Sequence, residues 1–163
     1  MPQNNSTPTI RQHQKFMLQA FNLAEQAYEE DEIPVGAIVV QEDRIIGKGY
    51  NQTERLNDAT AHAEMLAISA ACSTIESKYL TDCTLYVTLE PCPMCAGALV
   101  WSRIERVVFG TLDARAGACG SLFNIADNEK LNHRVEVIQG FMEEDCKWIL
   151  QHFFENKRSK SGL

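Results

Sequence analysis

The chain has 163 residues and an apolar fraction of 45%, which together predict one globular domain with a single core. Its 22 acidic and 15 basic residues give a net charge of −7, which argues against broad, nonspecific binding of nucleic acid but leaves room for a local basic patch. No stretch approaches the ~18 consecutive apolar residues of a membrane span, so we expect no membrane association.

The first half of the chain predicts a tail, a helix, a hairpin and a second helix. Residues 1–10 lack the basic and apolar regions of a signal peptide, so we predict a disordered tail on a cytoplasmic protein. Apolar residues at helical intervals predict an amphipathic helix over 11–30, and two β-branched runs predict an antiparallel hairpin over 35–50. The segment "AHAEMLAISAAC", apolar almost all round, predicts a buried helix with Thr60 as its N-cap.

The second half predicts three strands and two helices. "CTLYVTLE" is typical of a strand, and the prolines of "PCPMCAGALVWSRI" suit the first turn of a helix. "RVVFG" and "RVEVIQG" predict two more strands, separated by a loop over 111–133 that is too long for a tight turn and that we interpret as functional. A last helix is expected over 142–156, followed by a short basic tail over 158–163.

This order of elements predicts the fold class. Helices that alternate with short apolar strands indicate a sheet covered on both faces. The hairpin makes the first strand pair antiparallel, whereas the later strand-helix-strand connections favour parallel pairs. We therefore expect one domain over 11–157, an α/β protein with a three-layer α/β/α sandwich and a central mixed five-stranded sheet.

A cluster of metal-binding residue types is the most specific feature of the sequence. Cys92 and Cys95 lie on one face of the first turn of a helix, whose positive end favours the thiolates that zinc requires. His62 supplies a third ligand and leaves a fourth position for water, which zinc activates near neutral pH. Glu64 can then move protons, provided that His62 lies at the helix cap, since residues two apart on a helix point about 200° apart.

Other interpretations of these residues stay open. Cys92 and Cys95 are compatible with a redox couple, and His62 with an ordinary core histidine. Cys83 could complete a structural site with four ligands, which would make the protein a zinc-stabilised RNA-binding or scaffold module without catalysis. A structural site gives Glu64 no role, however, and a carboxylate in so apolar a segment needs one.

The motifs resemble a known family. The pattern His-Ala-Glu at 62–64, followed by "PCPMC" with Cys92 28 residues after Glu64, is the signature of the zinc cytidine and deoxycytidylate deaminase superfamily. The blocks "VGAIVV", "GKGYN", "TAHAEM", "DARAGACGSLFNI", "LNHRVEV" and "FFENKR" look like successive parts of bacterial tRNA-specific adenosine deaminases. This resemblance covers nearly the whole chain after about residue 16.

The resemblance implies a fold, a reaction and partners. It implies a cytidine deaminase-like fold and the hydrolytic deamination of adenosine to inosine at the wobble position of a tRNA anticodon. Zinc-bound hydroxide would attack C6 while Glu64 moves the proton, with one Zn²⁺ per subunit held by His62, Cys92 and Cys95. The partners would be a tRNA anticodon stem-loop and a second copy in a homodimer, for which the apolar helix with Trp101 offers an interface. The alternative is a free-base or nucleoside deaminase acting on guanine or cytosine with the same zinc chemistry.

The resemblance also assigns substrate contacts. Asn51 matches an asparagine that hydrogen-bonds the purine, the backbone at Ala63 would orient the base, and Asp113 matches an acidic position near the neighbouring ribose. On the last helix, aromatic and basic residues match positions next to the anticodon loop and the RNA backbone: Phe153, Phe154, Lys157 and Arg158. Glu155 departs from the pattern, since the family often has a basic residue there, and it weakens the local positive charge.

Overall fold

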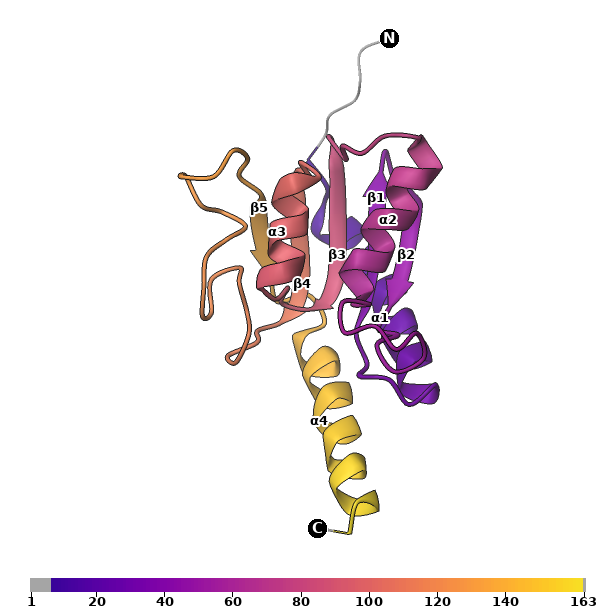
Figure 1. The fold of residues 1–163 in the computed structure, drawn as a ribbon. Helices are drawn as coiled ribbons and strands as arrows, with labels where there is room; N and C mark the ends of the chain where they lie inside the picture. The colour runs from indigo at the N-terminus through magenta and orange to yellow at the C-terminus, as the bar shows by residue number, and fades with distance from the viewer. Residues whose placement is uncertain (1–6, 163) are drawn as a thin grey trace.

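Five strands form one sheet in the order β2-β1-β3-β4-β5 (Figure 1). The computed structural model describes residues 7–162, so most of the tail predicted over 1–10, and residue 163, lie outside the described residues. β1 runs antiparallel to both of its neighbours, whereas β3, β4 and β5 are parallel, which confirms the mixed five-stranded sheet. The strands are β1 (Gly36–Gln41), β2 (Arg44–Tyr50), β3 (Cys83–Leu89), β4 (Arg106–Thr111) and β5 (Glu136–Gln139).

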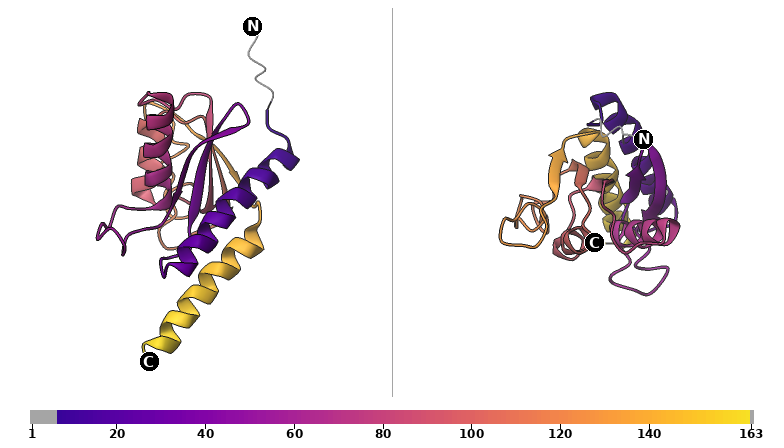
Figure 2. Two further views of the ribbon diagram at one scale, coloured as in Figure 1. Left: turned by 90° about the vertical axis from the view of Figure 1, so that its right-hand side faces the viewer. Right: turned by 90° about the horizontal axis from the view of Figure 1, so that it is seen from above.

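Helices cover both faces of the sheet, which confirms the three layers (Figure 2). α2 packs on β2 and β1, and α3 lies beside α2 on the same face. α1 packs on β1 and β3 from the opposite face, and α4 contacts β4 and runs alongside α1. The helices are α1 (Ile10–Glu29), α2 (Ala63–Ile75), α3 (Pro93–Trp101) and α4 (Glu143–Lys160).

The central strands are buried on both faces because each face carries a helical layer. Residues 83–88 of β3 and all of β4 are buried, as the near-continuous apolar runs of these strands predict. On β2, Gly47 and Gly49 allow α2 to approach closely. A Cβ at Gly47 would lie 2.6 Å from the backbone nitrogen of Ala71, and one at Gly49 would lie 2.7 Å from that of Ala67. The absence of side chains at these two glycines therefore lets the backbone of α2 pack directly on β2, and this close packing sets where the helix begins relative to the sheet.

The start of α2 differs from the prediction. Its N-cap is His62, not Thr60. Thr60 lies in the preceding turn, where its backbone N–H and its hydroxyl donate to Asp58 Oδ1 at 2.8 and 2.7 Å. The side chain of Thr60 is therefore used within the turn, and the helix begins two residues later than its capping preference indicated.

The two terminal helices are longer than predicted at their outer ends. α1 begins at Ile10, after a capping box between Thr9 and Gln12, so the helix starts within the segment predicted as a tail. α4 continues to Lys160, so residues 158–160 are helical although we predicted a basic tail from 158. Basic residues in the last turn suit the negative end of the helix dipole, which explains why the helix extends through them.

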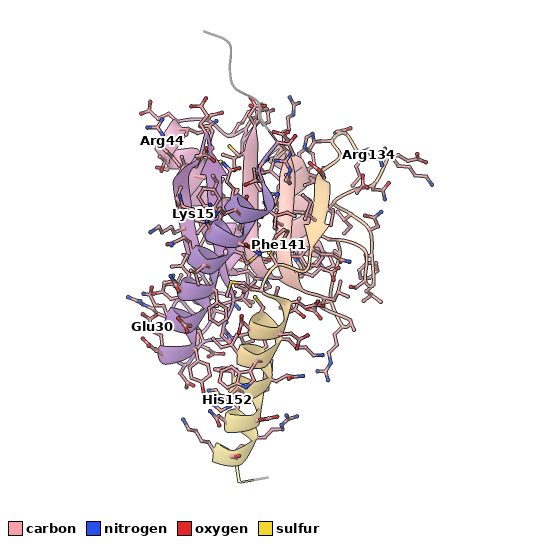
Figure 3. All side chains as sticks on the ribbon, turned by 180° about the vertical axis from the view of Figure 1, so that it is seen from behind. Lys15, Glu30, Arg44, Arg134, Phe141 and His152 are labelled. Atoms are coloured by element: carbon pink, nitrogen blue, oxygen red, sulfur yellow. The ribbon has the colours of Figure 1, made fainter. Side chains whose placement is uncertain are left out.

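A buried polar contact joins α1 to the sheet. His13 is only 4% exposed, and its Nδ1 lies 2.8 Å from the hydroxyl oxygen of Tyr86 on β3. Its ring also lies 5.2 Å from that of Phe141, which precedes α4 and is labelled in the rear view of Figure 3. Burial, followed by the charge of Arg106, lowers the pKa of His13, so the imidazole is neutral in the folded protein near pH 7.

We predict that His13 makes the protein less stable in mild acid. The unfolded chain takes up a proton near pH 6.5, but the folded chain does so only at lower pH, so stability falls as pH drops below about 6.5 and levels off below the folded pKa. Between pH 7 and pH 5, the wild type should lose about 1 kcal/mol more free energy of unfolding than His13→Gln. Urea unfolding at both pH values measures this difference, and parallel losses in the two proteins would contradict the prediction.

Candidate metal centre and active site

The N-termini of two helices meet at one edge of the sheet. α2 and α3 both begin at the lower edge in Figure 1, after the carboxyl ends of β2 and β3. His62 is the N-cap of α2 and Cys92 is the N-cap of α3, and neither side chain caps its own helix. Because cap residues lie outside the helical backbone, His62 and Glu64 are not bound by the helical angle between residues two apart. The prediction that His62 lies at the cap of the helix is therefore confirmed.

The three predicted ligands have the spacing of a zinc site. His62 Nδ1 lies 3.6 Å from Cys92 Sγ and 3.6 Å from Cys95 Sγ, and all three ligand atoms lie within 4.8 Å of one another. Zinc bonds of about 2.3 Å to sulfur and about 2.0 Å to nitrogen, at tetrahedral angles, place these atoms roughly 3.6 Å apart. The donor set therefore fits zinc with three protein ligands and one open position, as in catalytic sites.

Cys83 does not complete a fourth ligand. It is the first residue of β3, at the opposite end of that strand from Cys92, and it is not part of the group. Burial raises the pKa of its thiol to about 12, which keeps it protonated. The structural four-ligand interpretation with Cys83 is therefore wrong.

Electrostatics prepare Cys92 to bind a cation. The Cys95 thiol, followed by the His62 ring, lowers the pKa of Cys92 to about 4, so it is a thiolate at neutral pH. That thiolate, together with burial, raises the pKa of Cys95, so the metal-free pair retains one proton. Coordination of zinc by both sulfurs would require this proton to leave, since cysteine binds zinc as the thiolate.

Glu64 is a buried carboxyl group beside the metal ligands. It lies in the first turn of α2, is 4% exposed and is not one of the grouped ligand residues. Burial raises its pKa, and the Cys95 thiol and the His62 ring partly oppose this shift. A carboxyl group with a raised pKa can both accept and return a proton near neutral pH, which is what the predicted shuttle requires.

Asn51 connects the end of β2 to the start of α2. The side chain is 7% exposed, and its Oδ1 accepts a hydrogen bond of 2.9 Å from the Ala63 N–H. This bond satisfies one of the free N–H groups at the start of the helix, which the N-cap residue His62 leaves unbound. Among residues 7–162 the Asn51 Nδ2 has no hydrogen-bond acceptor, so it is available to a substrate.

Asp113 lies in a loop that follows β4. Its Oδ1 accepts hydrogen bonds from the N–H groups of Arg115 and Ala116, at 3.0 and 3.2 Å, which organise the turn that follows it. Glu90, for which the sequence predicted no role, contacts the same loop: its Oε1 accepts a hydrogen bond of 3.1 Å from the Asp113 N–H. Its sequence signal was an acidic residue between an apolar strand and Pro91, a position that needs partners if it is buried.

The four predicted residues of α4 fall into two pairs. Phe153 is buried, with its ring 6.0 Å from that of Tyr28, and Lys157 Nζ donates to Asp31 Oδ2 at 2.9 Å. These two side chains attach α4 to α1 and to the turn that follows α1. Phe154 is 44% exposed and Arg158 is exposed, so their contacts with RNA stay predictions that their positions permit.

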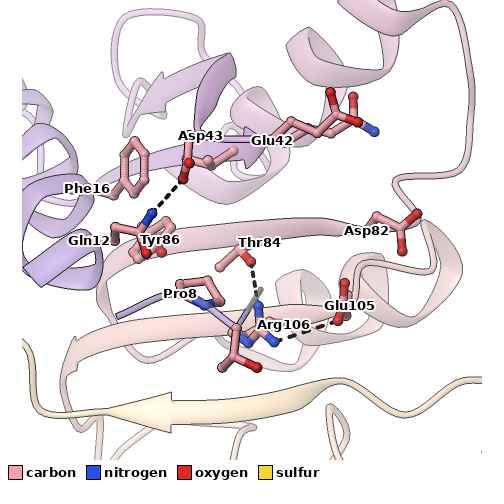
Figure 4. A pocket seen from close by; sticks show the side chains of 13 residues that line it. Pro8, Gln12, Phe16, Glu42, Asp43, Asp82, Thr84, Tyr86, Glu105 and Arg106 are labelled. Atoms are coloured by element: carbon pink, nitrogen blue, oxygen red, sulfur yellow. Dashed lines mark hydrogen bonds and ion pairs between the residues drawn. The ribbon is translucent and has the colours of Figure 1, made fainter. Parts of the chain in front are cut away.

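One cavity lies at the opposite end of the sheet from the metal ligands. It measures about 320 Å³, and Figure 4 shows carboxylates around it on the turn after β1 and at the starts of β3 and β4. Glu42, Asp43, Asp82 and Glu105 line it together with Arg106, whose side chain is already bound to Thr84 and Glu136. An acidic cavity repels phosphate groups, so it does not suit a nucleic-acid substrate.

Residues 10–111 match the family model of the cytidine and deoxycytidylate deaminase zinc-binding region. This match covers more than half of the chain and spans all three metal ligands. The chain belongs to the cytidine and deoxycytidylate deaminase family. It is thus a zinc-dependent deaminase, a hydrolase, and His62, Cys92 and Cys95 are positioned to bind its metal.

Relatives of this deaminase extend the similarity over most of its length. A protein of Aquifex aeolicus named tRNA-specific adenosine deaminase is 50% identical over 144 residues, which cover 88% of this chain and 95% of that protein. A protein of Bacillus subtilis with the same name is 45% identical over 151 residues, which cover 93% and 94% of the two chains. The similarity therefore includes the segment after residue 111, beyond the family model.

Solved structures agree with this assignment. A structure from a study of A-to-I editing by tRNA:A34 deaminases at the wobble position superposes with a TM-score of 0.80 at 40% identity, covering 83% of this deaminase and 99% of that chain. The guanine deaminase of Bacillus subtilis superposes with a TM-score of 0.61 at 39% identity, covering 67% and 70%. Within residues 7–162, none of the helices is long and apolar enough to cross a membrane.

Proposed function

We propose that this deaminase hydrolyses adenosine to inosine at the wobble position of a tRNA anticodon. The observation that carries the proposal is the similarity over about nine-tenths of the chain to tRNA-specific adenosine deaminases, and the cluster of three candidate zinc ligands with the buried Glu64 near it supports the proposal. The shorter coverage of the guanine deaminase makes free-base deamination the second candidate.

The residues of the site divide the work of the reaction. His62, Cys92 and Cys95 would hold the zinc ion, which would supply a water molecule whose lowered pKa allows it to be deprotonated and to attack C6 of the base near neutral pH. Glu64 accepts the proton of that water and later donates a proton to the departing amino group, so its carboxyl group ends as it began. Adenosine and water thereby give inosine and ammonia, with no other reactant.

The arrangement also supports an RNA substrate. Asn51 Nδ2 is available beside the start of α2, where it would bind the base next to the Ala63 backbone. Asp113 would contact the neighbouring ribose with the carboxylate oxygen that its turn does not use. α4 extends beyond the edge of the sheet at which the metal ligands lie (Figure 1), and there it exposes Phe154 for stacking and Arg158 for a phosphate.

Ammonia release tests this proposal. Zinc-loaded protein should release one ammonia per anticodon stem-loop with adenosine at the wobble position, and the RNA product should contain inosine. The matched control is the same stem-loop with guanosine at that position, which should release none. Release of ammonia from free guanine or cytosine, but not from the stem-loop, would reject the tRNA function and retain the zinc chemistry.

We also propose that two copies of the chain form a homodimer through the exposed face of α3, and that the protein acts on tRNA in the cytoplasm. Trp101 at the end of α3 is 78% exposed, the highest value among the exposed large hydrophobic residues of the described chain, and tryptophan is enriched among the residues that dominate protein interfaces. Trp101→Glu should raise the dimer dissociation constant by about 10-fold or more in sedimentation equilibrium. Trp148→Glu, on α4, is the matched control, since it changes another exposed tryptophan; equal effects would contradict the assignment to α3.

A further inference from the structure

Glu90 is a buried carboxylate to which the reaction assigns no role. It follows β3 and precedes the metal ligand Cys92 by two residues, yet it is not a member of the ligand group. It is only 2% exposed. Its backbone N–H donates to the carbonyl oxygen of Thr111 at 2.9 Å, which places it beside the end of β4.

The carboxylate of Glu90 is bound by one loop and by no cation in the described chain. Its Oε1 accepts from the Asp113 N–H at 3.1 Å, and its Oε2 accepts from the N–H groups of Cys119 and Ser121, each at 3.1 Å. The Ser121 hydroxyl also donates to Oε1. Four donors thus compensate the charge, and all of them belong to the loop over 113–121.

The loop is shaped around this carboxylate. A Cβ at Gly117 would overlap Glu90 Oε2 and lie 2.5 Å from the carbonyl oxygen of Asp113, so only glycine fits there. The Ala118 N–H donates to the carbonyl oxygen of Pro91 at 2.8 Å, directly before the first metal-ligating cysteine. The loop therefore contacts the metal-binding segment both through the Glu90 side chain and through the backbone beside it.

We infer that Glu90 is a positioning residue for substrate. It holds the loop over 113–121, and with it Asp113, at a set position relative to the zinc ligands. The inference rests on the proposed function, in which Asp113 contacts RNA beside the base at the metal centre. A carboxylate suits this role because it offers only acceptors to four donors, whereas the amide of Gln would point N–H groups at N–H groups.

Amide hydrogen exchange tests whether Glu90 stabilises the loop over 113–121, and it does not depend on an activity measurement. In zinc-loaded Glu90→Gln, the amides of Cys119 and Ser121 should exchange about 100-fold faster than in the wild type, because charge-assisted bonds are lost. Amides within α2 should keep their wild-type rates, and zinc should remain at one per chain. Ser121→Ala, which removes only the hydroxyl donor, is the matched control and should accelerate exchange far less.

Kinetics with the anticodon stem-loop test the positioning role. Glu90→Gln should raise KM about 10-fold while kcat changes by less than about 3-fold, since a displaced Asp113 weakens binding more than chemistry. A merely structural role would instead lower the melting temperature and kcat with KM unchanged, and that result would overturn the inference. If Glu90→Gln does not fold, Gly117→Ala provides the same test, since it keeps the Glu90 carboxylate and adds a methyl group that pushes the loop away from it.

The two proposals fail in different ways. A wild-type protein that does not deaminate the stem-loop would reject the proposed function, and the exchange rates would still show whether Glu90 fastens the loop. An active wild type with unchanged loop exchange in both Glu90→Gln and Gly117→Ala would reject the role of Glu90 alone.

Discussion

Glu64→Gln should abolish deamination while the protein remains folded and loaded with zinc. The change removes the group that carries the proton and leaves the volume of the side chain, so turnover should fall by about 10⁴-fold. Because burial already disfavours the charged form of Glu64, a neutral amide should not lower the melting temperature. Inosine formation from the stem-loop measures the turnover, and the zinc content of the same sample shows whether the metal is retained.

Glu29→Gln is the matched control for this prediction. Glu29 is an exposed residue at the end of α1, so the same change in charge should leave turnover at the wild-type rate. Residual activity of Glu64→Gln above one-tenth of the wild type would contradict the proton shuttle. Loss of zinc from Glu64→Gln would mean that this carboxyl group also holds the metal.

Cys92→Ala should abolish both zinc binding and the stabilisation that zinc provides. The wild-type site has a thiolate already formed at neutral pH and two further ligand atoms within 4.8 Å. Zinc at 1,000 times its dissociation constant adds about 4 kcal/mol to the free energy of unfolding. The melting temperature of the wild type should therefore rise on addition of zinc and fall with a chelator, and that of Cys92→Ala should respond to neither.

Cys72→Ala is the control for the loss of a thiol. Cys72 is a half-buried residue of α2 outside the ligand group, so this variant should keep one zinc per chain and the full response to a chelator. A disulfide between Cys92 and Cys95 with no bound metal in freshly purified protein would instead support the redox interpretation. Stoichiometric zinc in Cys92→Ala would show that the ligand set is wrong.

The sequence alone predicted the elements and the metal ligands because these depend on local patterns. Apolar periodicity and turn residues gave the order of helices and strands, since each element must present an apolar face to the core. The Cys92 and Cys95 pair could be recognised because both ligands lie on one helical turn. His62 could be predicted as the third ligand because the segment "AHAEMLAISAAC" is almost entirely apolar and offers few other side chains that bind metal.

Positions that depend on contacts between distant segments could not be predicted. Thr60 has the stronger capping preference, but its side chain binds Asp58, and Asn51 from the end of β2 satisfies the Ala63 N–H at the start of α2 instead. Phe153 and Phe154 are adjacent and chemically identical. Phe153 is buried because it packs against Tyr28 of α1, whereas Phe154 points away from that contact and is exposed.

The sequence by itself determined the layered fold, the three zinc ligands and the carboxyl group beside them, because spacing along the chain sets which side chains share a helix end. Only the tertiary structure decided how the substrate side of the site is built. Glu90 and its donors are separated by 23 to 31 residues, and no local pattern predicts that one loop will supply them all. A buried charge is tolerated only where the fold brings donors to it, so such a residue becomes interpretable when its partners in space are known.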